Sequence, residues 1–137
     1  MPIVQKTPPI SGSCLCKAVQ FELTQHPIRV VRCHCMSCRK ATGAMHTVWA
    51  VIEHAHFHWL GMMPSSYASS PKVQRTFCPT CGTSLTYRHM DEATIDVTVA
   101  SLDHPEHFSP QVEIWTSDQL IWDKQPHDLP QLLQDIE

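Results

Sequence analysis

The 137-residue sequence lacks the features that send a chain into or across a membrane. No apolar run reaches the roughly 20 residues that a membrane-spanning helix needs. The first thirteen residues hold one lysine and three prolines but no apolar core of signal-peptide length, so secretion is not expected. The sequence therefore predicts a cytoplasmic protein, in a reducing compartment that keeps thiols free.

A basic surface is also missing, because ten lysines and arginines stand against thirteen acidic residues and the formal net charge is -3. Nucleic acids and anionic membranes attract positively charged surfaces, so neither is expected as a partner. The sequence has no internal repeat and no segment that reads as a linker. Its length suits a single domain over residues 1–137.

Short segments of strand character make up most of the chain and predict a mainly β fold. Residues 19–23 and 95–99 alternate apolar and polar side chains, which is typical of half-buried strands. Residues 39–43 read as a turn or a helical turn closed by Gly43. Further strand-like segments cover residues 28–31, 46–60, 72–77, 83–87 and 112–115.

Helical spacing is clear at the C-terminal end, where it predicts a short helix. Leu129, Leu132, Leu133 and Ile136 recur at intervals of three and four. Asp128 stands at the capping position, and a proline follows in the first turn of the predicted helix.

Seven cysteines are many for this length, and their odd number fits a disulfide framework poorly. Cys78 and Cys81 are separated by two residues and precede a glycine, which is typical of a zinc knuckle. Cys14 and Cys16 can supply two more thiolates if the chain bends between them. The four would close a structural zinc site that joins distant segments. A redox pair at Cys78 and Cys81 is the alternative, although it calls for a helix where strand-like residues follow.

Cys33, Cys35 and Cys38 lie within six residues, too close together for each to enter a separate core niche. A turn can aim three sulfurs at one ion and leave one tetrahedral position open, as in catalytic zinc sites. Two alternatives stay open. A histidine could complete a structural site, although His34 is badly placed between two ligands, or the thiols could form a redox relay without metal.

The charge of such a site predicts its ligand. Zinc bound to three thiolates is already net negative, so a soft thiol suits the open position better than hydroxide. Arg39 and Lys40, beside the thiols, could receive the carboxylates of an anionic thiol such as glutathione, as could Arg32. The alternative for these cations is ordinary solvated surface charge. His34 and His46 are the candidates for a general acid.

His54, His56 and His58 alternate along the predicted strand 46–60, which would put three imidazoles on one face. Such a row could bind a metal ion. An exposed strand face is the plainer interpretation.

Together these motifs resemble the glutathione-dependent formaldehyde-activating enzyme family, which also includes centromere protein V. The matching stretches are Gly12-x-Cys14-x-Cys16, Cys33-His34-Cys35-x-x-Cys38-Arg39-Lys40-x-Thr42-Gly43, Arg75-x-Phe77-Cys78-x-x-Cys81-Gly82 and Ser101-Leu102-Asp103, over a core of about residues 12–122. Lys17 stands where the family usually has glycine, and Glu113 where histidine is common. The resemblance implies an Mss4-like, mainly β fold with zinc-stapled sheets.

The resemblance also implies carbon–sulfur lyase chemistry, in which glutathione adds to formaldehyde to give S-hydroxymethylglutathione. It implies the same division of the thiols: Cys14, Cys16, Cys78 and Cys81 on a structural zinc, and Cys33, Cys35 and Cys38 on a catalytic zinc. The sequence thus predicts a lyase with two zinc ions per chain that acts on adducts of a small thiol and an aldehyde. The alternative is a non-catalytic zinc module, with two structural sites, that binds a protein partner.

Overall fold

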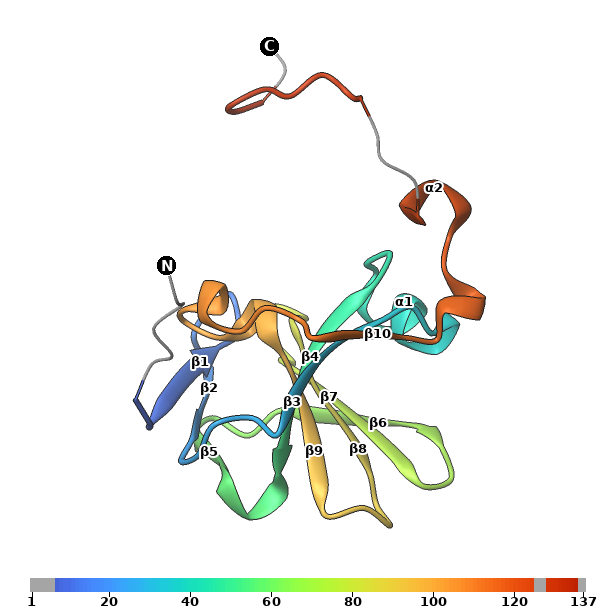
Figure 1. The fold of residues 1–137 in the computed structure, drawn as a ribbon. Coiled ribbons are helices and arrows are strands. Elements are labelled where there is room, and N and C mark those ends of the chain that lie inside the picture. Colours follow the sequence, from blue (N-terminus) through green and yellow to red (C-terminus); the bar gives the residue numbers. More distant parts are fainter. Residues whose placement is uncertain (1–6, 125–127, 136–137) are drawn as a thin grey trace.

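The computed structural model describes residues 7–124 and 128–135, and these residues form two β-sheets (Figure 1). The smaller sheet has the order β1-β2-β5, with β1 (Ile10–Ser13), β2 (Val19–Leu23) and β5 (Phe57–Gly61). The larger sheet has the order β10-β3-β4-β9-β8-β7-β6, with β3 (Arg29–Cys33), β4 (Thr47–Glu53), β6 (Ser65–Ser70), β7 (Val73–Phe77), β8 (Ser84–His89), β9 (Thr94–Thr98) and β10 (Val112–Ile114). The helical elements are α1 (Met36–Thr42), α2 (Ile121–Lys124) and the 3-10 turns η1 (His54–His56), η2 (Val99–Ser101), η3 (Pro105–His107) and η4 (Thr116–Asp118). The predicted mainly β fold is confirmed.

Strand β2 shows why the alternating pattern becomes a strand here. Val19, Phe21 and Leu23 are buried, whereas Gln20 between them is exposed. The strand pairs antiparallel with β1 on one side and β5 on the other, so its backbone groups are satisfied along both edges. The segment predicted from its alternation is thus the central strand of the smaller sheet.

The main core lies between the two sheets and draws on one face of the larger sheet. Val30, Ala50 and Val97 are neighbours across β3, β4 and β9, and cross-strand neighbours point to the same face. All three are buried together with Phe21 and Leu23 of the smaller sheet. The opposite face of the larger sheet carries a second cluster, which is described below with the site.

Gly12 marks the closest approach of β1 to the rest of the core. A Cβ atom there would lie 2.3 Å from the ring of Phe21 and 2.7 Å from the carbonyl oxygen of Ser101. Real side chains do not tolerate such distances, so only glycine fits. The glycine that begins the first cysteine motif therefore serves packing.

The short helix near the C-terminal end is present, but it lies upstream of the predicted position. It is α2, over Ile121–Lys124, whereas residues 128–135 have no helical turn and residue 136 lies outside the described residues. Leu129, Leu132 and Leu133 are all exposed. A short amphipathic segment without a surface to pack on does not keep helical structure in water, which explains the difference. In the described part of the chain, no helix has the length and apolar character to cross a membrane.

The prediction of one continuous strand over residues 46–60 is also wrong, because the 3-10 turn η1 divides this segment into two strands. Strand β4 ends at Glu53 in the larger sheet, and β5 begins at Phe57 in the smaller one. His54 and His56 lie in that turn and His58 on β5, so the three imidazoles do not share one strand face. The turn carries the chain from one sheet to the other, and this needs a break in the strand.

Candidate metal centres and active-site cavity

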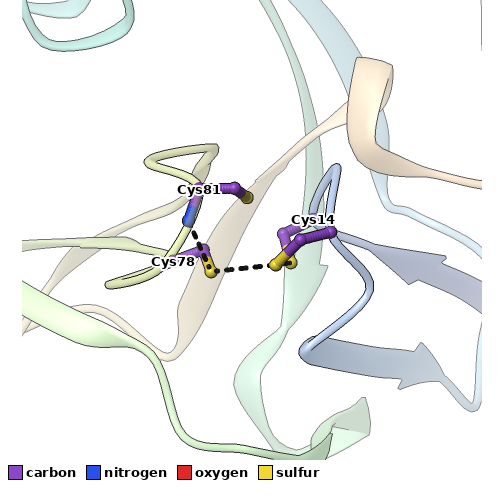
Figure 2. Close-up of side chains that lie close together, drawn as sticks. Cys14, Cys78 and Cys81 are labelled. Carbon is purple, nitrogen blue, oxygen red and sulfur yellow. Dashed lines mark hydrogen bonds between the residues drawn. The ribbon is translucent and has the colours of Figure 1, made fainter.

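Four thiols from two distant turns meet at one point. Cys14 and Cys16 belong to the turn between β1 and β2, and Cys78 and Cys81 to the turn between β7 and β8. Their sulfur atoms all lie within 4.8 Å of one another. Figure 2 shows Cys14 facing Cys78 and Cys81 across the space between the two turns. The structure thus brings together the four thiols that the sequence predicts for the closed site.

Backbone conformation makes both turns tight enough for this. Lys17 has φ 65° and Gly82 has φ 82°, both in the left-handed region. Backbone N–H groups point at the sulfurs: Val19 donates to Cys14 at 3.3 Å, and Cys81 to Cys78 at 3.4 Å. Such hydrogen bonds favour the thiolate form that metal binding requires.

The spacing of the sulfurs fits a zinc ion. Zinc–sulfur bonds of about 2.3 Å at tetrahedral angles put neighbouring sulfurs about 3.8 Å apart. The Cys14 and Cys16 sulfurs are 3.6 Å apart, and those of Cys16 and Cys78 are 3.8 Å apart. The residues present therefore fit a four-thiolate site.

Thr83 links the two turns, a role that the sequence motifs did not reveal. Its hydroxyl accepts a hydrogen bond from the backbone N–H of Leu15 at 3.1 Å. It also lies 3.2 Å from the Cys81 sulfur, and this contact, with hydrogen bonds from backbone groups, lowers the pKa of Cys81 to about 5. The Thr83 side chain thus holds the two turns together and stabilises the negative charge of the Cys81 thiolate.

The second group of thiols surrounds the start of α1. Cys33 ends β3, Cys35 is the N-cap residue of α1, and Cys38 is buried in its first turns. As the sequence predicts, Gly43 closes this helical turn, with φ 72°. The side chain of Cys33 hydrogen-bonds to Cys38, whereas the three sulfurs are not all within 4.8 Å of one another. Two of the three predicted ligands therefore meet, and the half-buried Cys35 would have to turn toward them to complete a metal site.

Arg75 is the cation nearest to this group. Two nitrogens of its guanidinium, Nη1 and Nη2, each lie 3.7 Å from the Cys38 sulfur. The third nitrogen, Nε, donates a hydrogen bond to the Ser69 hydroxyl at 3.0 Å. The guanidinium also stacks over the ring of Tyr87, 5.0 Å from its centroid. The hydrogen bond from Cys33, then the bonds and charge of Arg75, lower the pKa of Cys38 to about 5 against the opposing effect of burial. The site thus favours a thiolate at neutral pH.

Arg75 belongs to a row of side chains on the second face of the larger sheet. Tyr67, Arg75, Tyr87 and Asp96 are successive partners across β6, β7, β8 and β9. Trp49 lies on the same face, where it is buried with Cys33 and Cys38. Helix α1 covers part of this face, because its Cys38 is buried there with Trp49, while Tyr67 stays exposed. It differs in kind from the apolar face that forms the main core.

A cavity of about 580 Å³ opens beside the row. Lys40 of α1, Trp49, Tyr67 and Arg75 are among the residues that line it. Arg39, the other predicted substrate cation, does not line it, and its guanidinium donates to the Asp118 carbonyl at 3.0 Å. The structure therefore brings Lys40 and Arg75 to one cavity. Arg75 occurs in the motif, but nothing in the sequence indicates that it faces Cys38.

The two candidate general acids, His34 and His46, form a separate group with Asp123. Their rings are 5.6 Å apart, and the ligand atoms of all three residues lie within 4.8 Å of one another. His34 is fully buried and contacts Glu113 as well, with its Nε2 3.0 Å from a carboxylate oxygen. His34 therefore contacts the carboxylates of Glu113 and Asp123, and the group does not include a thiol. No sequence motif pointed to Asp123.

Comparison with known proteins gives a family and a fold. The family model described as "Glutathione-dependent formaldehyde-activating enzyme" matches residues 9–118. An uncharacterized lyase of Schizosaccharomyces pombe is 25% identical over 140 residues, covering 83% of this chain and 96% of the relative. A crystal structure of a Rhodobacter sphaeroides protein superposes with a TM-score of 0.61 at 22% identity, covering 75% of this chain and 98% of that one. This last likeness concerns the fold alone.

The four-thiol cluster predicts unequal costs for two cysteine substitutions. Cys81→Ser removes a ligand that joins distant turns, and metal binding at such a site is part of the folding free energy. We expect it to lower the melting temperature by at least about 10 °C or to prevent folding. Cys35→Ser, at the edge of the second group, should leave a folded protein within about 3 °C of wild type. Thermal unfolding followed by circular dichroism measures both, and equal losses would indicate two structural sites.

Asp96 predicts a pH-dependent stability. Burial, with repulsion from Glu92, raises the pKa of Asp96 to about 7. Its contribution to folding is fully present below the unfolded-state pKa of about 4 and is lost as the pH rises through 7. We therefore expect Asp96→Asn to raise the free energy of unfolding by up to about 4 kcal/mol at pH 8 and clearly less at pH 5. Urea unfolding at both pH values measures this, with exposed Asp103→Asn as the control, and equal gains at the two pH values would contradict it.

Proposed function

This chain belongs to the glutathione-dependent formaldehyde-activating enzyme family, and on that basis we propose that it is a carbon–sulfur lyase for adducts of a glutathione-like thiol and an aldehyde such as formaldehyde. The observation that carries the proposal is the Arg75 side chain, which bonds to the Cys38 sulfur and also lines the 580 Å³ cavity with Lys40. A reactive sulfur centre and a cationic cavity are thus adjacent. The relative named as a lyase supports the same class of reaction.

The reaction is an addition that needs no oxidant. The sulfur of the thiol forms a bond to the aldehyde carbon while the carbon–oxygen double bond becomes single. The carbonyl oxygen takes up the proton that the thiol loses, and the product is a hemithioacetal. In reverse the carbon–sulfur bond breaks and the proton returns to sulfur. The protein therefore has to bind an anionic thiol, stabilise its thiolate and hold the aldehyde beside it.

The cavity supplies the binding part. Lys40 and Arg75 bring positive charge to a pocket otherwise lined by aromatic and small side chains. Glutathione carries two carboxylates, which such cations can receive. Trp49 and Tyr67 provide apolar wall against the rest of the molecule. We propose Lys40 as the principal substrate cation and Arg39 as a secondary one, because Arg39 is already bonded to the Asp118 carbonyl.

The triad supplies the chemical part. We propose that Cys33, Cys35 and Cys38 hold the catalytic zinc ion, which when bound would lower the pKa of the incoming thiol and orient it. Arg75 holds Cys38 in its ionised form, since both guanidinium donors point at the sulfur. Cys35, at the helix N-cap, closes the site by turning toward the other two. Cys14, Cys16, Cys78 and Cys81 hold the second, structural zinc ion.

The cysteines also bear on the compartment. All seven are free thiols, without a disulfide among them. Two zinc sites made of thiolates require reducing conditions, because oxidation to disulfides would destroy them. We propose the cytoplasm as the place of action.

The lyase proposal predicts a measurable rate. Zinc-loaded protein should accelerate formation of S-hydroxymethylglutathione from glutathione and formaldehyde, as followed by NMR exchange spectroscopy. Cys35→Ser should lower this acceleration at least about 100-fold and Arg75→Gln about 10- to 100-fold, since they remove a ligand and its supporting donor. Lys72→Ala, a cation outside the cavity, is the control. No acceleration by the zinc-loaded wild type would contradict the proposal and favour the protein-binding alternative.

The cavity predicts a preference for anionic thiols. Glutathione should bind more tightly than a neutral thiol of similar pKa, and the preference should shrink as salt screens the charges. Lys40→Ala should reduce it about fivefold at low salt, Arg39→Ala should reduce it less, and Lys72→Ala should leave it unchanged. Calorimetric titration measures all four proteins. A preference that survives in Lys40→Ala would place the thiol elsewhere.

A further inference from the structure

We propose that His34, His46 and Asp123 bind a third metal ion, a divalent cation of the zinc class, at the junction of β3, β4 and α2. Each of the three residues offers one ligand atom, and these atoms lie within 4.8 Å of one another. Nδ1 of each histidine faces Oδ2 of Asp123. Two imidazoles and one carboxylate are a donor set that zinc accepts. The group is separate from both sets of thiols.

The distances match the edges of a zinc tetrahedron. With bonds of 2.0–2.2 Å to nitrogen and oxygen, neighbouring ligand atoms lie about 3.3–3.6 Å apart. Oδ2 of Asp123 is 3.2 Å from Nδ1 of His46 and 3.7 Å from Nδ1 of His34. Three protein ligands would leave a fourth position for water.

Glu113 orients the His34 ring so that Nδ1 is available as a metal ligand. Its carboxylate lies 3.0 Å from Nε2 of His34 and is itself paired with Arg32 at 3.5 Å. An ionised carboxylate only accepts hydrogen bonds, so Nε2 is the nitrogen that carries the proton. In the neutral form of the ring, which is the form that binds a metal ion, the lone pair is then on Nδ1, the nitrogen that faces Asp123. A carboxylate bonded to the far nitrogen of a metal-binding histidine is the usual outer partner of such a site.

Without a cation, this arrangement leaves a buried acceptor unsatisfied. Nδ1 of His34 is buried and has no hydrogen-bond partner within the described residues. Its lone pair is directed at a carboxylate oxygen, which is also an acceptor. A buried polar atom without a partner costs about 1–3 kcal/mol. A metal ion between the two acceptors removes this cost and the repulsion together.

The position of α2 is a second reason to expect a metal ion at Asp123. Ile121 and Trp122 are 75% and 61% exposed, so no apolar face holds this short helix to the protein. Asp123 is its one half-buried residue. In the preceding turn η4, Asp118 accepts a hydrogen bond from the Met36 N–H at 3.3 Å. A metal ion on Asp123 would fasten this end of the chain to the segments on either side of α1.

The test compares metal content among matched variants. Zinc-loaded, desalted wild type should contain one ion per chain more than Asp123→Asn and His46→Gln, by mass spectrometry of the metal. His54→Gln, an exposed histidine of η1, should retain the wild-type content. Asp123→Asn combined with Cys35→Ser should lose two ions, because the sites are independent. In cobalt-loaded protein, Asp123→Asn should leave the thiolate-to-metal absorption bands unchanged.

A second readout follows from the position of the ligands. Hydrogen exchange at residues 119–124 should slow when zinc is added to metal-depleted wild type, and should not slow in Asp123→Asn. Asp123 is partly exposed on a short helix, so its substitution leaves the fold intact. Equal metal content in wild type, Asp123→Asn and His46→Gln would overturn the proposal and assign the group to a hydrogen-bonded relay. An equal loss in His54→Gln would overturn it too.

Discussion

The meeting of two turns 62 residues apart, at the thiols of Cys16 and Cys78, is the contact on which the rest of the structure depends. One turn belongs to the smaller sheet and the other to the larger sheet. Their sulfur cluster therefore joins the sheets at one end of the main core. Bringing such distant points together costs chain entropy, and a metal ion bound by the four thiolates would offset that cost. In a chain of this size the apolar core alone gives only a small free energy of unfolding, so the contact between the two turns is needed for stability.

With the sheets joined, the larger sheet has two different faces, and function follows from the difference. The face with Val30, Ala50 and Val97 is closed by the smaller sheet and is apolar. The other face carries Arg75 and Asp96 and is partly covered by α1, whose Cys38 is buried against it. Burial on this face raises the pKa of Asp96 to about 7, whereas hydrogen bonds from Cys33 and Arg75, with the charge of Arg75, lower the pKa of the Cys38 thiol to about 5. A rigid, closed core thus supports an open face where ionised sulfur persists beside a cavity.

The sequence predicted the features that depend on local pattern. The alternation of residues 19–23, the grouping of Cys14 and Cys16 with Cys78 and Cys81, and the turn ending at Gly43 all follow from spacing along the chain. The helix predicted over residues 129–136 was misplaced because spacing does not tell whether a surface exists for it to pack on. Likewise, no local pattern indicates that β4 and β5 belong to different sheets.

The contacts between residues far apart in the sequence could not be predicted either, because no local pattern indicates them. Arg75 meets Cys38 because of the register of β7 and the packing of α1, and Asp123 meets His34 because the chain returns past α1. These contacts are long-range, so only the fold discloses them. They are also the contacts on which the proposed open zinc site and the proposed third metal site depend.

The central claim is that the thiols divide into a closed site at the joint between the sheets and an open site on the second face. Anomalous diffraction at the zinc edge from crystals soaked with glutathione tests it most directly. The account predicts one zinc peak surrounded by Cys14, Cys16, Cys78 and Cys81, and another bound by Cys33, Cys35 and Cys38 with the glutathione sulfur as its fourth ligand. A triad that holds no zinc, or a zinc closed by a fourth protein ligand with glutathione absent, would contradict it.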